Sequence, residues 1–421
     1  MNSEEIFRMA LGLEAPWEVT KISFEINSTG SKDLHIYLGY NKNFVKFKDE
    51  NGKSLIYDHN ERMWRHLNFF QYNSYLHCDV PRVKDKESGN ILQVEVPWAR
   101  PGSGFTLLFE AFSMLLIECE MPVNSVGKIL GEYAQRIWTI FHYWISMAYQ
   151  EVDHTNITSM AIDETSSKRG HNYVTIAVDM VESRVIHAVA GKGADTITEI
   201  ASYLKSKGCA INKVDSVCID LSPSFISGVS KEFEDATLVF DRFHVKQLLN
   251  KAMDDVRRID YMTHKEELKG CKYIFLKNDE TLSKHQRYMK NELITLLPNI
   301  GEAYRLKELF DSFWDFKDQQ EAKGFLWYWC DMARESKLQP MVKFANTVTS
   351  HWTGITNYTE MKISNGIIEG INTKIQLAKR RARGYRNMTN FINMIYFIGG
   401  KLKFKYPDYL LSVKQLPSFS T

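Results

Sequence analysis

The sequence predicts a multidomain α+β protein, in which an α/β core is interrupted by an all-helical insertion and preceded by a β-rich region and a helical pair. Two observations predict this class. Short β-branched runs alternate with helical stretches over residues 151–250, whereas residues 251–350 show only helical periodicity and many aromatic residues. With 421 residues, the chain is long enough for several units with cores of their own.

Residues 1–104 are expected to be rich in β-strands. Apolar residues recur over positions 19–26 and alternate with polar residues over positions 34–38, which is typical of half-buried strands. Turns are indicated by the polar, Gly-containing segments 27–31 and 49–52.

Residues 105–150 change to helical periodicity. Residues 122–130 and 133–138 are expected to form two helices joined by a short turn. This pattern is compatible with a helix-turn-helix, although similar helix pairs occur in many proteins that do not bind DNA.

Residues 151–250 give the clearest α/β pattern. Their predicted order is β-β-β-α-β-α-β, which is that of a ribonuclease-H-like sheet. Residues 351–400 would complete this core with an amphipathic helix, and residues 401–421 would form a tail. The strands are expected at residues 160–163, 173–179, 185–189, 214–220 and 237–241, and the intervening helices at residues 195–207 and 223–233.

Three carboxylates occupy the positions that such a sheet uses for phosphodiester chemistry. Asp163 lies on the first predicted strand, Asp220 follows the fourth strand, and Glu369 lies early in the late helix. Two-metal phosphoryl transfer needs several carboxylates around two ions, and Mg²⁺ prefers such hard oxygen ligands. Glu164 and Asp179 remain rivals for the position of Asp163, because a single aspartate at a strand end is more often a turn or capping residue.

The helix that carries Glu369 has two predicted faces at 100° per residue. Ser364 or Asn365 is a plausible N-cap. Ile367, Ile371, Ile375 and Ala378 would form the core side, and Glu369, Thr373, Gln376, Arg380 and Arg383 the opposite side.

A basic run follows Glu369 and is the predicted DNA-binding segment, since Lys and Arg contacts to phosphate supply most nucleic-acid affinity. The alternative is a solvated helix end whose cations favour the C-terminal dipole. The basic residues are Lys374, Lys379, Arg380, Arg381, Arg383 and Arg386.

Asp241 and His244 close the strand before the insertion. We expect them to form a buried pair that anchors the insertion to the sheet, in preference to a direct role in chemistry. No Ser-His-Asp constellation or Gly-rich phosphate loop stands out in the chain.

Composition excludes several classes. Lys and Arg number 53 against 51 for Asp and Glu, so net charge alone does not indicate a polyanion partner. The six cysteines are scattered without a CxxC pair, which indicates reduced thiols and neither a zinc site nor a disulfide framework. The N-terminus lacks an apolar signal core, and no apolar stretch is long enough to span a bilayer, so we expect a soluble cytoplasmic protein.

Several of these segments resemble the DDE transposases of bacterial insertion sequences, specifically the ISL-three family. The resemblance covers roughly residues 45–400, and its last two segments are the most specific. The segments are Trp64-Arg65-His66-Leu67, Val96-Pro97-Trp98-Ala99-Arg100, Ser103-Gly104-Phe105-Thr106, Ile162-Asp163-Glu164-Thr165-Ser166, Asp241-Arg242-Phe243-His244-Val245, Ser364-Asn365-Gly366 with Glu369-Gly370-Ile371-Asn372, and Lys379-Arg380-Arg381-Ala382-Arg383-Gly384-Tyr385-Arg386-Asn387.

The resemblance implies a ribonuclease-H-like catalytic core with a helical insertion, and Asp163, Asp220 and Glu369 as the DDE triad holding two Mg²⁺ or Mn²⁺ ions. It also implies binding to the terminal inverted repeats of the element, DNA cleavage followed by strand transfer, and a homodimer or higher oligomer on DNA in the bacterial nucleoid. A catalytically inactive DNA-binding relative and a ribonuclease-H-like nuclease are the alternative readings. Stacking on an unpaired base at the cut site is a minor role considered for Trp327, Trp329 or Trp352.

One feature departs from the family. Its members commonly carry an N-terminal zinc ribbon with two CxxC knuckles, whereas residues 48–52 and 85–89 here retain turn glycines without thiolates. Without those soft ligands a tetrahedral zinc site is not expected. We therefore predict a degenerate ribbon and no bound zinc; elemental analysis that finds about one zinc per chain would contradict this.

Overall fold

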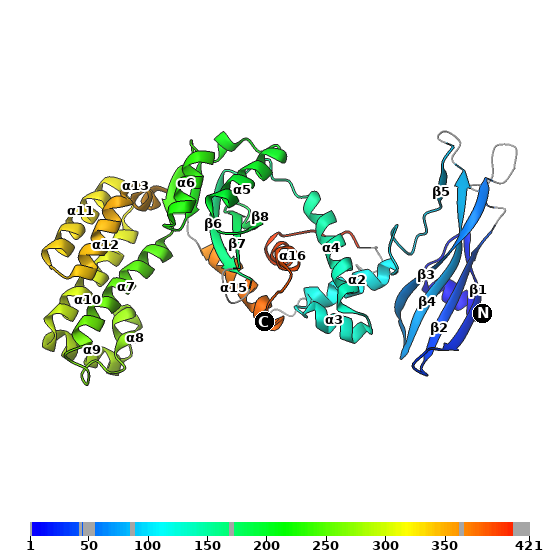
Figure 1. Cartoon of the computed structure of the whole chain (residues 1–421), viewed down its shortest axis with the longest axis horizontal. Coiled ribbons are helices and arrows are strands. Elements are labelled where there is room, and N and C mark those ends of the chain that lie inside the picture. Colours follow the sequence, from blue (N-terminus) through cyan, green and yellow to red (C-terminus); the bar gives the residue numbers. More distant parts are fainter. Residues whose placement is uncertain are drawn as a thin grey trace. The chain divides into compact units, whose positions relative to one another are not determined.

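The computed structural model describes residues 2–41, 44, 55–84, 89–167, 172–361 and 366–406. The chain divides into two compact units, one of Met1–Ala148 with Lys403–Thr421 and the other of Tyr149–Leu402 (Figure 1). The segment 48–52 and residues 85–88, where the zinc knuckles would lie, fall outside the described residues, as do Ser364 and Asn365.

The first unit contains a five-stranded sheet of order β1-β2-β4-β3, with β5 paired to β4. β2 and β4 are parallel and the other neighbours are antiparallel. The β-rich character is as predicted, but β3 and β4 form a longer hairpin than expected, and helix α1 was not predicted. The elements are α1 (Ser3–Ala10), β1 (Trp17–Ile26), β2 (Lys32–Tyr40), β3 (Ile56–Phe69), β4 (Tyr72–Lys84) and β5 (Ile91–Gln93).

One face of this sheet is apolar because its strands alternate buried and accessible residues, as in β2. Three indole rings form the centre of that core. The ring of Trp98 lies edge-on to the rings of Trp17 and Trp64, with centroids 4.9 Å and 5.7 Å apart.

Three helices follow in the same unit, α2 (Leu107–Glu118), α3 (Val123–Leu130) and α4 (Ala134–Gln150). The predicted helix, short turn and helix correspond to α3 and α4. Gly131 ends α3 at a φ of 68°, a conformation that favours glycine. Gly127 is needed for the close approach of the turn, since an added Cβ would lie 2.8 Å from the Glu132 carbonyl oxygen.

The second unit is built on a sheet of order β10-β9-β6-β7-β8. β9 and β10 are parallel to β6, whereas β7 is antiparallel to both of its neighbours. The predicted order of strands and helices is confirmed over this segment. The elements are β6 (Ser159–Ser166), β7 (Tyr173–Asp179), β8 (Arg184–Ala190), α5 (Ala194–Ser206), β9 (Ser216–Ile219), α6 (Pro223–Glu232) and β10 (Thr237–Phe240).

Helices cover both faces of this sheet. Ile162 belongs to the same buried cluster as Ile197 of α5 and Phe225 of α6. Its neighbour Asp163 contacts α15 (Gly366–Arg381) instead. Because successive strand residues point to opposite faces, α15 lies on the face away from α5 and α6.

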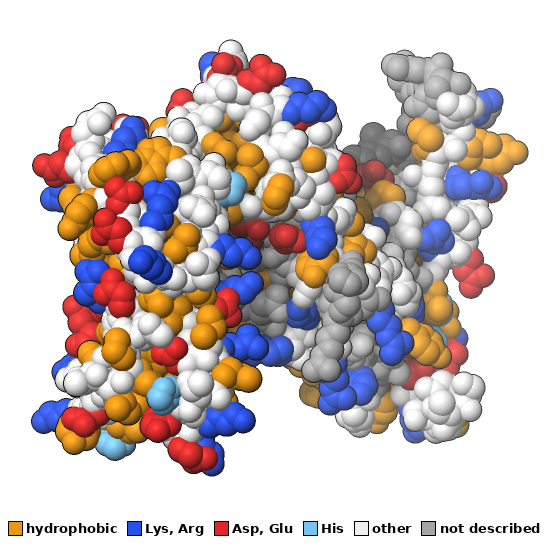
Figure 2. All heavy atoms as spheres, turned by 60° about the vertical axis from the view of Figure 1, so that its left-hand side comes forward, with side chains coloured by type: hydrophobic (Ala, Val, Ile, Leu, Met, Phe, Trp, Pro, Cys, Tyr) orange, Lys and Arg blue, Asp and Glu red, His pale blue; other side chains and the backbone are white. Residues whose placement is uncertain are grey.

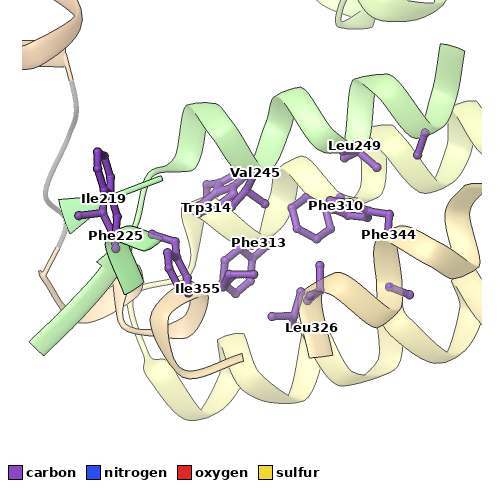
Figure 3. Close-up of a cluster of buried hydrophobic side chains, with 14 of the residues drawn as sticks. Ile219, Phe225, Val245, Leu249, Phe310, Phe313, Trp314, Leu326, Phe344 and Ile355 are labelled. Atoms are coloured by element: carbon purple, nitrogen blue, oxygen red, sulfur yellow. The ribbon is translucent and has the colours of Figure 1, made fainter. Parts of the chain in front are cut away.

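The insertion is all-helical in its described residues, as predicted. Its aromatic residues are largely internal, and the core of the insertion is continuous with that of the sheet through α7 and α6 (Figure 3). Trp329 is fully buried and its Nε1 donates to the Leu306 carbonyl oxygen at 2.8 Å, which excludes this residue from base stacking. The helices are α7 (Arg242–Tyr261), α8 (Lys272–Leu276), α9 (Lys284–Leu296), α10 (Pro298–Asp311), α11 (Gln319–Glu335), α12 (Gln339–Ser350), α13 (Trp352–Thr356) and α14 (Tyr358–Met361).

Helix α15 departs from its predicted wheel in two ways. Ile368 rather than Ile367 lies in the buried stripe with Ile371 and Ile375. The helix ends at Arg381, so the prediction that Arg383 shares the face of Glu369 is wrong: Arg383 has a φ of 58° and lies in the turn that leads to α16 (Met388–Gly399).

The visible surface of the insertion mixes positive, negative and apolar side chains, without a field of one sign (Figure 2). Among the described residues, no helix is both long enough and apolar enough to cross a bilayer.

Candidate active site

Three aspartates lie in a row at the carboxyl ends of neighbouring parallel strands. Asp163 lies within β6, three residues before its end and level with Asp220, which directly follows β9; Asp241 directly follows β10. The pairing of β6 with β9 and of β9 with β10 brings these positions to the same edge of the sheet. In open α/β sheets this edge is where ligands bind.

A pocket of about 420 Å³ opens at this edge, and it holds two of the three predicted triad residues. Asp163 and Asp220 line it together with Glu164 and His244. The other lining residues are Thr165, Ser166, Tyr173, Lys192, Asn372 and Gln376.

The Asp163 carboxylate is held in one orientation by two donors. Its Oδ1 accepts from the Glu164 backbone N–H at 2.8 Å, and its Oδ2 accepts from Asn372 Nδ2 at 2.7 Å. Asp220 is half-buried, and its Oδ1 accepts from the Ser222 backbone N–H at 2.9 Å. Each hydrogen bond occupies one lone pair, so both carboxylates retain lone pairs for a further ligand.

Like charges crowd this pocket. Burial raises the pKa of Asp163, and the neighbouring carboxylates Asp241 and Asp220 raise it further, against the Glu164 N–H and His244. Burial also raises the pKa of Glu164, with Asp220 as the next cause. Such a group of carboxylates is costly to ionise together and is relieved by a bound cation.

His244 faces the pocket while bonded to Asp241. Its Nδ1 lies 2.7 Å from Asp241 Oδ2, and Asp241 Oδ1 accepts the Phe243 backbone N–H at 2.8 Å as the N-cap of α7. The hydrogen bond to Asp241 raises the pKa of His244. The pair therefore anchors the start of α7, as predicted, and in addition presents an imidazole to the pocket, which the sequence alone did not reveal.

Glu369 is exposed on the first turn of α15 and does not line the pocket. It lies one helical turn before Asn372, about 4.5 Å along the helix axis, so it is near the pocket without entering it. The structure thus brings Asp163 and Asp220 together and leaves Glu369 beside them.

The two rivals for Asp163 are separated by the structure. Asp179 pairs with Met160 at the opposite end of β6, where its Oδ1 accepts the backbone N–H groups of Val181 and Glu182 at 3.0 Å. Asp179 is therefore a turn residue. Glu164 lines the pocket and remains a candidate beside Asp163.

The residues of the basic run fall into two groups, one that contacts the protein and one that is exposed. Lys379 is tied to the strand, with its Nζ 2.8 Å from the Ser166 carbonyl oxygen and 3.2 Å from Ser166 Oγ. The other predicted DNA-binding residues are exposed: Lys374, Arg380, Arg381, Arg383 and Arg386.

Six pocket residues were not predicted as site residues by the sequence analysis, namely Thr165, Ser166, Tyr173, Lys192, Asn372 and Gln376. A signal existed for two of them, because Asn372 and Gln376 follow Glu369 at helical spacings of three and seven and so lie on its side of α15. Lys192 carried no such signal.

The donor chemistry of the pocket suits a hard divalent cation, since its crowded ligands are carboxylate oxygens. Within the described ranges, no group of three or more His, Cys, Asp or Glu side chains is already arranged to hold a metal ion. The carboxylates in the pocket that could share one are Asp163, Glu164 and Asp220, and Glu369 lies outside the pocket on α15.

Carboxylates at the strand ends, an exposed basic segment and a helix-turn-helix define a class of protein that performs phosphodiester chemistry on DNA. Comparisons with known families give the particular one. Residues 160–395 match the family model described as transposase, for DDE transposases of the ISL3 group, and residues 94–145 match the model described as the helix-turn-helix domain of transposase family ISL3. The chain therefore belongs to the ISL3 family of insertion-sequence transposases.

Individual relatives agree along most of the chain. The chain is 26% identical over 425 residues to the transposase for insertion sequence element IS1557 of Mycobacterium tuberculosis, covering 92% of this chain and 93% of the relative. It is 23% identical over 344 residues to the transposase for insertion sequence element IS1001 of Bordetella parapertussis, covering 80% of this chain and 84% of the relative.

Proposed function

We propose that this transposase binds the terminal inverted repeats of its own insertion sequence and catalyses metal-dependent DNA cleavage and strand transfer. The observation that carries the proposal is the convergence of Asp163 and Asp220 in one open pocket at the carboxyl ends of β6 and β9. Family membership supports the reading of these carboxylates as members of a DDE triad.

In this proposal the second unit contains a ribonuclease-H-like core, made of residues 151–250 and 351–400 and interrupted by the helical insertion 251–350. The sheet order β10-β9-β6-β7-β8, with β7 alone antiparallel, supports it. The N-terminal sheet would be a degenerate zinc ribbon that reads the element ends together with α3 and α4, without zinc.

Asp163, Asp220 and Glu369 would hold Mg²⁺ or Mn²⁺. Two such ions, when bound, supply an activated water or 3′-OH and stabilise the oxygen that leaves the phosphorus. Asn372 keeps the Asp163 carboxylate in its orientation, and Asp241 keeps the His244 ring facing the pocket. The exposed cations of the basic segment would contact phosphates beside the pocket.

Cleavage of paired ends requires two active sites, so we propose a homodimer or higher oligomer on DNA. The working environment would be the nucleoid of a bacterial cytoplasm. In the first step a water opens a phosphodiester bond at the element end and frees a 3′-OH. In the second step this 3′-OH attacks target DNA, and no covalent protein–DNA bond forms.

The test is to incubate the purified protein with labelled element ends, a target duplex and Mg²⁺, and to map nicks and joined strands. Nicks at the element boundary followed by joined products are expected. Nicks without any joined product would identify a nuclease, and end binding without nicks would identify a DNA-binding protein that lacks catalysis; either result contradicts the proposal.

A further inference from the structure

Helix α15 is hydrogen-bonded to strand β6 by three side chains. Asn372 Nδ2 donates to Asp163 Oδ2 at 2.7 Å, and Gln376 Nε2 donates to Thr165 Oγ1 at 2.8 Å. One turn further, the Lys379 ammonium donates to the carbonyl oxygen and Oγ of the last residue of β6, at 2.8 Å and 3.2 Å. The three donors follow one another along α15 in the same order as their acceptors follow one another along β6.

The three donors share one face of the helix. At 100° per residue, Gln376 lies about 40° and Lys379 about 20° from Asn372 around the axis, on opposite sides of it. A single strip of α15 therefore faces β6, and below it Ile371 and Ile375 are buried. Burial lowers the pKa of Lys379, in keeping with a cation that is turned toward the protein.

The opposite face carries the exposed cations. Lys374 and Arg381 lie roughly 180–200° from Asn372 around the helix axis, and both are exposed. Arg380 is also exposed. The basic segment thus consists of two groups with different surroundings, which its sequence alone does not distinguish.

We propose that Asn372, Gln376 and Lys379 form a latch that fixes the register of α15 on β6, so that Asn372 is a positioning residue for Asp163 and Lys379 is not a DNA-phosphate ligand. The part that concerns Asp163 rests on the proposed function of the pocket. With the latch in place, Glu369 lies one helical turn before Asn372, on the side of the latch where Asp163 lies.

The physical reason lies in the geometry of ligand support. A carboxylate that binds a cation through one oxygen needs its other oxygen held, and outer partners of this kind are worth about 10- to 100-fold in metal affinity or activity. Asn372 supplies such a donor from the helix that also carries Glu369, so one rigid element would set the spacing of both carboxylates.

The role of Lys379 is tested by the salt dependence of DNA binding, which does not require cleavage. A cation that neutralises a phosphate contributes about 0.9 to the slope of log K against log salt concentration. Lys379→Met is expected to leave the slope for an element-end duplex unchanged, whereas Arg380→Met is expected to reduce it by about 0.9. A reduction of the same size in Lys379→Met would overturn the latch. An unchanged slope in Arg380→Met would count against the proposed DNA-binding face and leave the latch standing.

The role of Asn372 is tested by metal binding. In Asn372→Ala, the Mn²⁺ concentration for half-maximal cleavage of an element end should rise about 10- to 100-fold, with end binding unchanged. Titration of Mn²⁺ into the protein–DNA complex, read by the electron spin resonance of free Mn²⁺, should show the same loss of affinity. Thr373→Ala, an exposed neighbour on the same helix, is the matched control and should leave both values unchanged.

Wild-type Mn²⁺ affinity in a folded Asn372→Ala protein would overturn the assignment. Folding is checked by circular dichroism. If the alanine variant does not fold, Asn372→Ser, which keeps a shorter hydroxyl donor, takes its place and is expected to show a smaller loss of Mn²⁺ affinity. Wild-type affinity in that variant would also contradict the assignment, because the shorter serine side chain holds the Asp163 carboxylate less closely than the Asn372 amide does.

Discussion

The two sheets of this protein bury charge in opposite ways. In the N-terminal sheet, Arg65 is 3% exposed and its guanidinium is surrounded by acceptors and one carboxylate. In the sheet of the second unit, Asp163 has two hydrogen-bond donors but lies beside other carboxylates, and its pKa is raised by burial and by Asp241 and Asp220. The Arg65 guanidinium is paired with acceptors and holds secondary-structure elements together, whereas the Asp163 carboxylate lies among like charges that a bound cation would stabilise.

Arg65 joins the sheet to the helix-turn-helix of the same unit. It forms an ion pair with Glu132, in the turn between α3 and α4, at 3.7 Å from Nε to Oε1. The Arg65 guanidinium also lies over the aromatic rings of Tyr75 and Phe109. Its hydrogen-bond acceptors are the carbonyl oxygens of His66, Ser74 and Leu130 and the side-chain oxygens of Asn68 and Asn73. A buried charge with partners is structural, and one among like charges indicates a ligand site.

The largest effect is expected from the three carboxylates that we propose as the DDE triad. Asp163→Asn, Asp220→Asn and Glu369→Gln should each reduce Mg²⁺-dependent cleavage of element ends by about 10³-fold or more, since each removes a charged ligand. End binding, measured by gel shift, should be retained. Asp195→Asn, at an exposed carboxylate of α5, is the matched control. Cleavage at the wild-type rate in any one of the three variants removes that residue from the triad.

Breaking the satisfied charge should cost stability instead. Arg65→Met removes the donor to three carbonyl oxygens and two side-chain amide oxygens, while Glu132 keeps its ion pair with Arg136. We expect the first unit to lose about 3–5 kcal/mol of unfolding free energy, since buried acceptors without a donor are costly. Urea unfolding followed by tryptophan fluorescence measures the loss. Arg62→Met, at a half-buried neighbour on the same strand, should cost less than about 1 kcal/mol. Equal losses in the two variants would show that Arg65 has no special structural role.

Acid should act on the region of Arg65 through His66. Burial and the charge of Arg65 lower the pKa of His66 to about 4. Because this pKa lies below the unfolded value near 6.5, stability is fully present above pH 6.5 and falls by roughly 1.4 kcal/mol per pH unit between 6.5 and 4. The urea unfolding transition of the first unit, which Arg65→Met shifts, should show this dependence of the unfolding free energy on pH. His66→Gln should reduce that dependence. An unaltered slope in His66→Gln would assign the acid sensitivity to other groups.

The smallest expected effect has the opposite sign. Without divalent ions, Asp220→Asn should raise the unfolding free energy of the second unit by about 1 kcal/mol, because it removes a like charge beside Asp163 and Glu164. Thermal unfolding in the presence of EDTA measures it, with Asp195→Asn again as the control. A lower midpoint for Asp220→Asn than for the wild type would mean that the carboxylates are not in conflict.

The sequence predicted the sheet of the second unit well because each strand is a short β-branched run that is closed by a turn or a helix. The placement of Asp163 and Asp220 at one edge of the sheet was predicted for the same reason, since strand order alone brings both positions there. The role of Asp179 required three-dimensional information, because its N–H partners at Val181 and Glu182 make a turn that resembles many others.

Other features could not be predicted because their partners are distant in sequence. Asn372 contacts Asp163 from 209 residues away, and Arg65 reaches Leu130 from 65 residues away. Arg383 was placed on the helix face because the rotation of 100° per residue was continued beyond Arg381. The helix ends there, and Arg383 itself has a positive φ. The helical wheel placed Glu369 away from the core side, as the structure has it, but its absence from the pocket depends on the register of α15 on β6, which no local pattern encodes.

The most direct test of the central claim, that Asp220 ligates a catalytic divalent ion, exchanges its oxygen ligand for sulfur. Cleavage of a labelled element end by Asp220→Cys is compared in Mg²⁺ and in Mn²⁺. Mg²⁺ requires hard oxygen ligands and Mn²⁺ is more tolerant of a thiolate, so we expect cleavage to be lost in Mg²⁺ and to return in Mn²⁺. Wild-type cleavage by Asp220→Cys in Mg²⁺ would contradict the claim.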